Sequence, residues 1–173
     1  TGECNYEIKK IAYLKDTAAD NGAILVQSDE FNFAELNLPF SFPFFGKDYS
    51  KLTVSPNGVI YLDNIPVTND HINDTSAPLT SIAALHTDLT AEVNPYGIRA
   101  RIESEKAVIY WQVKHYKDRL GAGYEIRTVI NKSGLITTSL KAGDYTSLDL
   151  AKTATIGIKG DNSLETATYA ASS

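Results

Sequence analysis

Apolar and polar residues alternate along several stretches of this chain, which is the period of a β-strand. The clearest stretch is AVIYWQV, residues 107–113, in which the first, third, fifth and seventh side chains are apolar. The same alternation occurs in GIRARI (97–102), YEIRTVI (124–130) and ATIGIK (154–159). An antiparallel sheet that buries one face and leaves the other in water requires this pattern. We therefore expect a half-buried strand at each of these stretches.

Residues typical of tight turns separate these stretches. Asn21-Gly22 and Asn57-Gly58 suit the positive φ angles of such turns, and residues 94–97 and 132–134 are of similar composition. The pattern predicts an all-β fold, an antiparallel β-sandwich or jelly-roll-like arrangement of about ten to twelve strands. We expect one domain over residues 1–173, with at most one short helix, at residues 146–154.

The densest apolar stretch is LPFSFPFFGKDYSKLTVSPNGVIYL, residues 38–62. Phe40, Phe42 and Phe44 alternate and therefore face one way along a strand. Each phenylalanine buries on the order of 150–250 Å² when it enters a core. Pro43 cannot donate a ladder hydrogen bond, which favours an edge strand or a bulge. An exposed aromatic binding strip is the alternative to a core strand, and we favour the core.

The same stretch resembles a pattern found in nidogen-like (NIDO-type) extracellular domains and in related β-sandwich modules of bacterial secreted proteases and surface proteins. The residues that carry the resemblance are Phe40, Phe42, Phe44, Gly46, Tyr49, Val54, Ser55, Asn57 and Gly58. Three later blocks, IAALHTDL, AVIYWQVKHY and ATIGIKG, are similar to family blocks and follow in the expected order. Ala84 and His86 stand where the family usually has a proline and an aromatic residue.

The resemblance covers residues 38–160 and leaves residues 1–37 outside as additional strands. It implies an extracellular, all-β accessory or adhesive module. It carries no catalytic residue over to this chain.

Charge and hydropathy limit the classes of partner that the chain is expected to bind. The net charge is −5 and the basic residues are scattered, so we expect no nucleic-acid partner. No apolar run approaches the roughly 20 residues that cross a bilayer, so we expect no membrane insertion. The single cysteine, Cys4, has no internal partner for a disulfide. It is either a free thiol or paired with a segment outside this chain.

Catalytic motifs are absent from the sequence. It has three histidines but no Gly-X-Ser-X-Gly elbow, no His-Glu-X-X-His and no glycine-rich phosphate loop. We therefore expect no enzymatic activity. A glycosidase-like carboxylate pair stays open as an alternative, because its spacing exists only in three dimensions.

Oxygen-rich residues make calcium the one cofactor to consider. Asp70 and Asp74 lie in a stretch rich in Asp and Asn, and Asp88 follows on another loop. Ca²⁺ takes six to eight oxygen ligands, which such loops supply. The alternative is that these side chains stabilise ordinary turns without a metal.

A second loop, residues 114–124, is the candidate for ligand contact. His115, Tyr116 and Arg119 are expected to form a tip that contacts sugar or protein, because loops on a rigid scaffold often carry function. A solvated hairpin without a ligand is the alternative.

Taken together, the sequence predicts a non-catalytic extracellular or cell-surface module for binding or adhesion, with a glycan or a protein as ligand. One alternative is a structural subunit of a surface fibre or layer that binds other copies of itself by strand exchange. Residues 1–14 are then the exchanged strand, or otherwise an ordinary first strand of the domain. The other alternative is an accessory domain of a secreted hydrolase.

Overall fold

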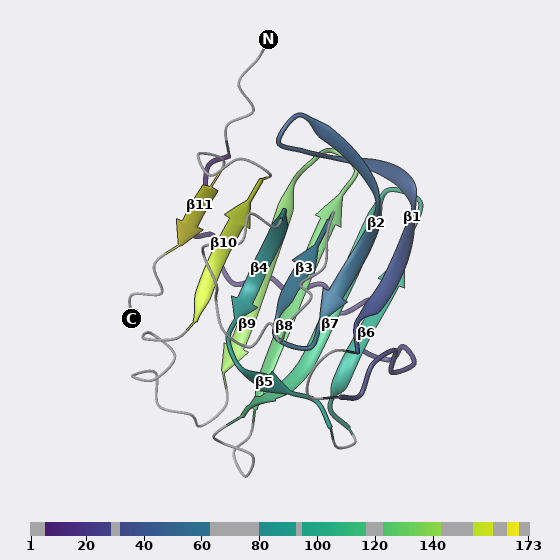
Figure 1. Cartoon of the computed structure of the whole chain (residues 1–173), viewed down its shortest axis with the longest axis vertical. Coiled ribbons are helices and arrows are strands. Elements are labelled where there is room, and N and C mark those ends of the chain that lie inside the picture. Colours follow the sequence, from purple (N-terminus) through teal and green to yellow (C-terminus); the bar gives the residue numbers. More distant parts are fainter. Residues whose placement is uncertain are drawn as a thin grey trace.

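The protein is a two-layer antiparallel β-sandwich (Figure 1). The computed structural model describes residues 6–28, 32–62, 80–92, 95–116, 123–142, 154–160 and 166–169. Within these residues there are eleven strands and no helix. The predicted all-β sandwich is confirmed, and the strand number lies in the expected range. The predicted short helix falls, except for Ala154, outside the described residues.

The sheet nearer the viewer in Figure 1, called the front sheet, has six strands in the order β1-β2-β3-β4-β10-β11. Their bounds are β1 Ala34–Phe44, β2 Lys47–Ser55, β3 Val59–Tyr61, β4 Ser81–His86, β10 Thr155–Lys159 and β11 Thr166–Tyr169. The second sheet, called the back sheet, has the order β5-β7-β8-β9, and β6 also pairs with β7. Its strands are β5 Leu89–Thr90, β6 Gly97–Ile102, β7 Lys106–His115, β8 Tyr124–Asn131 and β9 Ile136–Ala142.

The core lies between the two sheets and is built from the faces that the alternation predicts. Phe40, Phe42 and Phe44 of β1 have exposed fractions of 6%, 0% and 1%, which confirms them as core residues. Trp111 on β7 is fully buried, and its indole Nε1–H donates to the Ser55 carbonyl across the sandwich at 2.8 Å. That bond satisfies the polar atom of the largest core side chain and ties the two sheets together.

β1 is an edge strand, as Pro43 indicates. It lies at the end of the front sheet, and its register against β2 shifts between Asn37 and Phe42. An edge position with an irregular register tolerates a proline, because one side of the strand makes no ladder.

The β1–β2 hairpin turns at Phe45 and Gly46, whose φ angles are 46° and 77°. Two positive φ angles are what a two-residue type I′ turn needs. A bulky residue such as phenylalanine in this region is an outlier. The Phe45 ring contacts the rings of Phe44 and Tyr6, each with centroids 4.8 Å away.

The next turn, between β2 and β3, is buried and joins the sheets. The Asn57 side-chain Oδ1 accepts the Leu89 N–H at 2.8 Å, although Leu89 belongs to the back sheet. Gly58 has φ 77°, and a Cβ there would overlap the carbonyl oxygen of Leu85. The Asn-Gly pair therefore reverses the chain as predicted. It also links the β2–β3 turn to Leu89 of the back sheet.

A segment ahead of β1, residues 15–28, crosses the outer face of the back sheet, and we call it the strap. In Figure 1 its purple trace passes behind the sheets. The Leu25 N–H donates to the Ile98 carbonyl at 2.8 Å, and Ala19 packs with Val108 and Tyr110. The alternation predicts that this face of β7 and β8 is solvated. The strap covers it instead, so Val108, Tyr110 and Arg127 are buried.

Candidate functional site

Loops from both sheets meet at one end of the sandwich, which we call the loop end. β4 finishes at His86, and after two intervening residues the chain enters β5 in the back sheet. There Leu89 pairs with His115, the last residue of β7. The Tyr116 N–H donates to the Asp88 carbonyl at 3.0 Å. The structure thus brings together Asp88, His115 and Tyr116, which the sequence placed in two separate candidate sites.

Exposure distinguishes these residues. Tyr116 is 46% exposed, whereas His115 is only 5% exposed. Tyr116 therefore presents a surface to a ligand, and the His115 side chain packs inside the end of the sandwich. Arg119, the third residue expected at this tip, lies outside the described residues.

A second aromatic ring at the loop end, that of Tyr96, is held in place by Lys114 and by the close approach of Gly123. The Lys114 ammonium lies over the Tyr96 ring, 4.8 Å from its centroid. A Cβ on Gly123 would come within 2.5 Å of the Val113 carbonyl oxygen and 3.2 Å of the Tyr96 ring. Glycine at that position therefore lets Tyr96 lie close to the start of β8. Sequence reasoning missed Tyr96, because nothing in its neighbourhood shows that it meets Lys114.

A groove adjoins the loop end. It has a volume of about 500 Å³ and is lined by Leu25, Val26, Gln27, Asn32 and Phe33. These residues come from the strap and from the chain just before β1. The Gln27 side-chain amide donates to the Tyr96 carbonyl at 3.1 Å, which connects the groove to Tyr96.

The calcium prediction concerns residues that the structure covers only in part. Asp70 and Asp74 lie outside the described residues. Within the described ranges, no group of three or more His, Cys, Asp or Glu is placed to hold a metal ion, so Asp88 joins no such group there. The calcium site stays a prediction for the loop that contains Asp70 and Asp74.

The most deeply buried charge among the described residues lies elsewhere, under the strap. The Arg127 side chain is 2% exposed and donates to both carboxylate oxygens of Asp20 at 2.8 Å. It also donates to Glu125 at 3.1 Å, and its guanidinium stacks 4.2 Å from the Tyr110 ring centroid. The Tyr110 hydroxyl donates to the same Glu125 oxygen at 3.0 Å.

Protonation in this cluster follows from burial and hydrogen bonding. Burial, and next the hydrogen bond to Glu125, raise the pKa of Tyr110 to about 12. Burial alone would raise the pKa of Glu125, but hydrogen bonds from Tyr110 and Arg127 outweigh it and leave that pKa lowered. The hydrogen bonds to Asp20 raise the pKa of Arg127, although burial opposes this.

These protonation states let Tyr110, Glu125 and Arg127 hold Asp20 of the strap through a connected set of hydrogen bonds. Tyr110 stays a neutral donor, Glu125 stays an acceptor and Arg127 stays a cation, so each partner holds the state that its hydrogen bonds need. A second pair, Lys106 with Asp16 at 2.7 Å, fixes the start of the strap. The sequence placed Glu125 and Arg127 on the polar face of their strand, but gave no sign that Asp20 would meet them.

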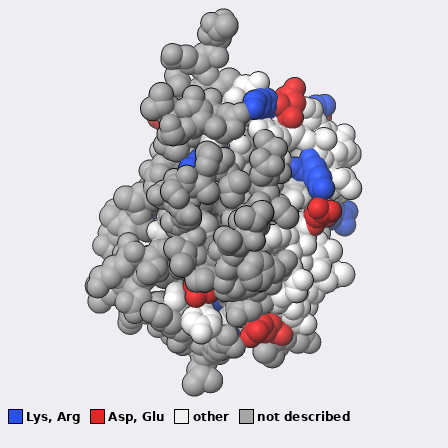
Figure 2. Space-filling model, viewed as in Figure 1, with Lys and Arg blue, Asp and Glu red and all other residues white. Residues whose placement is uncertain are grey.

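On the described part of the face shown in Figure 2, basic and acidic side chains lie side by side rather than forming a field of one sign. No helix among the described residues is long and apolar enough to span a membrane.

The two stacked sheets, the strapped outer face and the clustered loops define an all-β sandwich module. The chain belongs to the NIDO-related family, whose model matches residues 5–173. The match includes residues 5–37, which the sequence motifs had left outside. Membership of this family points to an extracellular domain. Neither the curated proteins nor the solved structures gave a match to this chain.

Proposed function

We propose that the protein is a non-catalytic extracellular module that binds a glycan at the loop end and the adjoining groove. The observation that carries the proposal is that Tyr116, Tyr96 and Gln27 lie at the same end of the sandwich, with Gln27 bonded to the Tyr96 carbonyl. Binding residues are commonly displayed on loops that a stable scaffold positions.

The chemistry of this surface favours a sugar. Aromatic faces stack on the apolar faces of sugar rings, and side-chain amides both donate to and accept from hydroxyl groups. Tyr96 and Tyr116 supply the rings, while Gln27 and Asn32 supply the amides. Sites for drug-like molecules are mostly apolar and enclosed, unlike a groove lined partly by amides.

The test is a glycan array probed with the full chain, followed by titration calorimetry with the strongest hit. Tyr116→Ala is expected to weaken binding at least tenfold, about 1.4 kcal/mol. Leu135→Ala is the matched control, because Leu135 is 61% exposed in the β8–β9 turn at the opposite end of the sandwich. Equal affinities for the Tyr116 variant and the wild type contradict the proposed site.

A blank array contradicts a glycan ligand altogether. A pull-down from extracellular extracts then gives the competing outcome, a protein partner. Capture that depends on Tyr116 would keep the site but change the class of ligand.

A second candidate function, a subunit of a surface fibre or layer, is favoured by a separate observation. Four large apolar side chains ahead of the strap are exposed by 39–78%: Ile8, Ile11, Tyr13 and Leu14. Several large apolar side chains exposed on one short segment mark an interaction surface more often than an isolated exposed residue does. Light scattering at increasing protein concentration tests this function, and a constant monomer mass counts against it.

A further inference from the structure

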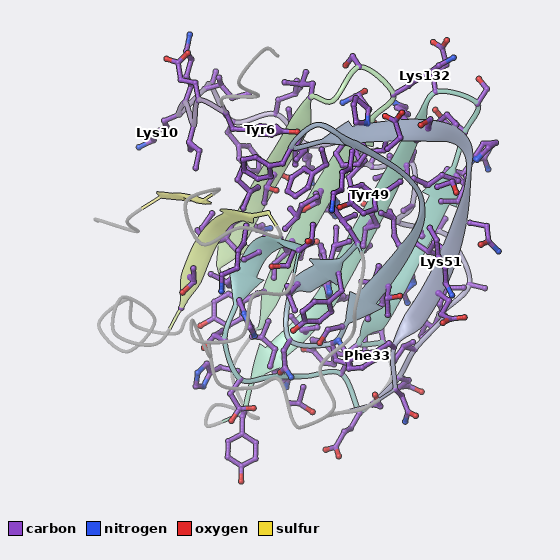
Figure 3. The ribbon with its side chains drawn as sticks, turned by 45° about the horizontal axis from the view of Figure 1, so that its top comes forward. Tyr6, Lys10, Phe33, Tyr49, Lys51 and Lys132 are labelled. Carbon is purple, nitrogen blue, oxygen red and sulfur yellow. The ribbon has the colours of Figure 1, made fainter. Side chains whose placement is uncertain are left out.

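Tyr6 inserts its ring into an aromatic socket at the tip of the β1–β2 hairpin. The socket consists of Pro43, Phe44, Phe45 and Tyr49. The Tyr6 ring centroid lies 5.4 Å from that of Phe44 and 4.8 Å from that of Phe45. The Tyr6 hydroxyl donates to the Pro43 carbonyl at 3.2 Å. Figure 3 shows Tyr6 beside the hairpin that carries Tyr49.

The backbone conformation of the turn indicates that the Phe45 ring is kept for its contact with Tyr6. Asparagine or glycine adopts a positive φ at little cost, whereas phenylalanine at φ 46° is strained. The strained backbone presents the ring to Tyr6, and Phe44 supports it from behind at 4.8 Å. A residue chosen only to make the turn would not be aromatic.

Beyond Tyr6, residues 7–14 are exposed and make few polar contacts with the part of the chain that the structure describes. Their backbone groups form no hydrogen bond with any residue that the structure describes. Within the same described part, their only ion pair is local, between Glu7 and Lys9 at 3.5 Å. The segment is therefore held at Tyr6 and again at Asp16, with exposed apolar side chains in between.

We propose that two copies of this chain exchange this segment, so that Tyr6 of one copy occupies the socket of the other. The inference rests on the second candidate function and names the contact through which copies assemble. Each copy carries both the ring and the socket, so exchange preserves every contact that Tyr6 makes and adds burial of Ile8, Ile11, Tyr13 and Leu14. This extra burial is available only when a second chain covers the segment.

Charge favours a second copy as the occupant. Residues 1–15, the part of the chain ahead of Asp16, hold Lys9, Lys10 and Lys15 against Glu3 and Glu7, a net charge of +1. The whole chain has a net charge of −5, which leaves −6 on the remainder. The basic segment of one copy therefore approaches an acidic body on the other, and opposite charges favour that encounter.

The experiment measures self-association of the full chain by sedimentation equilibrium, under reducing conditions so that Cys4 cannot link copies. The wild type is expected to form a dimer whose population rises with concentration. Tyr6→Ala is expected to raise the dimer dissociation constant at least tenfold. Leu25→Ala is the control, because Leu25 is 48% exposed on the strap and lies outside the exchanged segment.

Mixing two variants tests whether the contact is made between chains. Tyr6→Ala keeps the socket and loses the ring, whereas Phe45→Gly keeps the ring, opens the socket and tolerates the positive φ. Each variant alone is expected to remain monomeric, and a mixture is expected to form heterodimers through the one intact pair. Circular dichroism confirms that both variants are folded before they are mixed.

The outcomes separate the two ideas. A wild type that stays monomeric at every concentration overturns both the assembly function and the exchange. An oligomer that Tyr6→Ala leaves unchanged, or a mixture that fails to associate, overturns the exchange alone.

Discussion

A buried guanidinium is costly unless carboxylates meet it, and Arg127 meets two. Its contacts also fix the neighbouring tyrosine, because Glu125 accepts from both Arg127 and Tyr110. Removing any one member therefore changes the hydrogen bonding of the others. Arg127 stabilises the fold by holding the strap against the back sheet. Asp20 of the strap supplies the carboxylate that balances the buried positive charge.

Tyr110 gives this cluster a measurable pH dependence. Its folded-state pKa is raised from 10.0 to about 12, so the folded protein binds the hydroxyl proton more tightly than the unfolded chain does. The resulting stabilisation is complete below pH 10 and is lost as the pH rises from 10 to about 12. Two units correspond to about 2–3 kcal/mol.

We expect Tyr110→Phe to show a shallower loss of stability above pH 10 than the wild type. Urea denaturation at pH 9 and at pH 11.5 measures the difference. Lys106 also has a raised pKa, mainly through its hydrogen bond to Asp16, so it contributes an alkaline loss to both proteins. Only the difference between them reports Tyr110, and identical alkaline slopes contradict the assignment.

At the scale of elements, the strap is held by ion pairs at Asp16 and Asp20 and by backbone hydrogen bonds at Leu25 and Val26. Asp20→Asn leaves the buried Arg127 with Glu125 as its one carboxylate partner. Breaking a buried pair costs about 3–5 kcal/mol, and the partial exposure of Asp20, 26%, lowers our expectation to about 2–3 kcal/mol. Urea denaturation gives the free energy of unfolding, and hydrogen exchange of the Leu25 amide reports release of the strap.

The matched control for this substitution is Glu35→Gln. Glu35 pairs with Lys51 at 3.1 Å, but both side chains are more than half exposed. Such a pair is worth about 0–1 kcal/mol. Equal losses for the two variants would mean that the Arg127 pair contributes no more than a surface ion pair.

The strands and the strap also show how much of the structure can be predicted from the sequence. Period-two alternation identified the inward faces of β1 and β7, because burial on one side of a strand leaves that signal in the chain itself. It placed Arg127 in water, since the covering strap has irregular backbone and no period. The turn at Phe45 was likewise hidden, because turn rules look for asparagine or glycine at positive φ.

The candidate site likewise has residues that the sequence identifies and contacts between them that it does not. Tyr116 is identifiable from its loop, and Asp88 from its oxygen-rich context. Their meeting is not, because it depends on the chain passing from β4 in one sheet to β5 in the other. Residues 1–14 were identified as a candidate exchanged strand, but Tyr6 could not be singled out within them, because its socket forms only when the β1–β2 hairpin closes.

For the molecule as a whole, Trp111 provides a single reporter. It is the only tryptophan, it is fully buried, and its indole N–H bonds across the sandwich. We expect its fluorescence to shift to longer wavelength on unfolding, with the same urea midpoint as the circular dichroism of the sheets. Coincident transitions indicate two-state unfolding of one cooperative sandwich. Separate midpoints would show that the sheets unfold independently.

The strap also sets an order of events during synthesis. Asp20 leaves the ribosome long before its partner, because 107 residues separate it from Arg127. At about 5–20 residues per second, that delay amounts to roughly 5–20 s. For this interval Asp20 lacks its bidentate partner, although the strap's contacts with Lys106, Val108 and Tyr110 become available earlier in synthesis. Full attachment of the strap therefore waits for β8, and among the described strands only β9, β10 and β11 are synthesised after it.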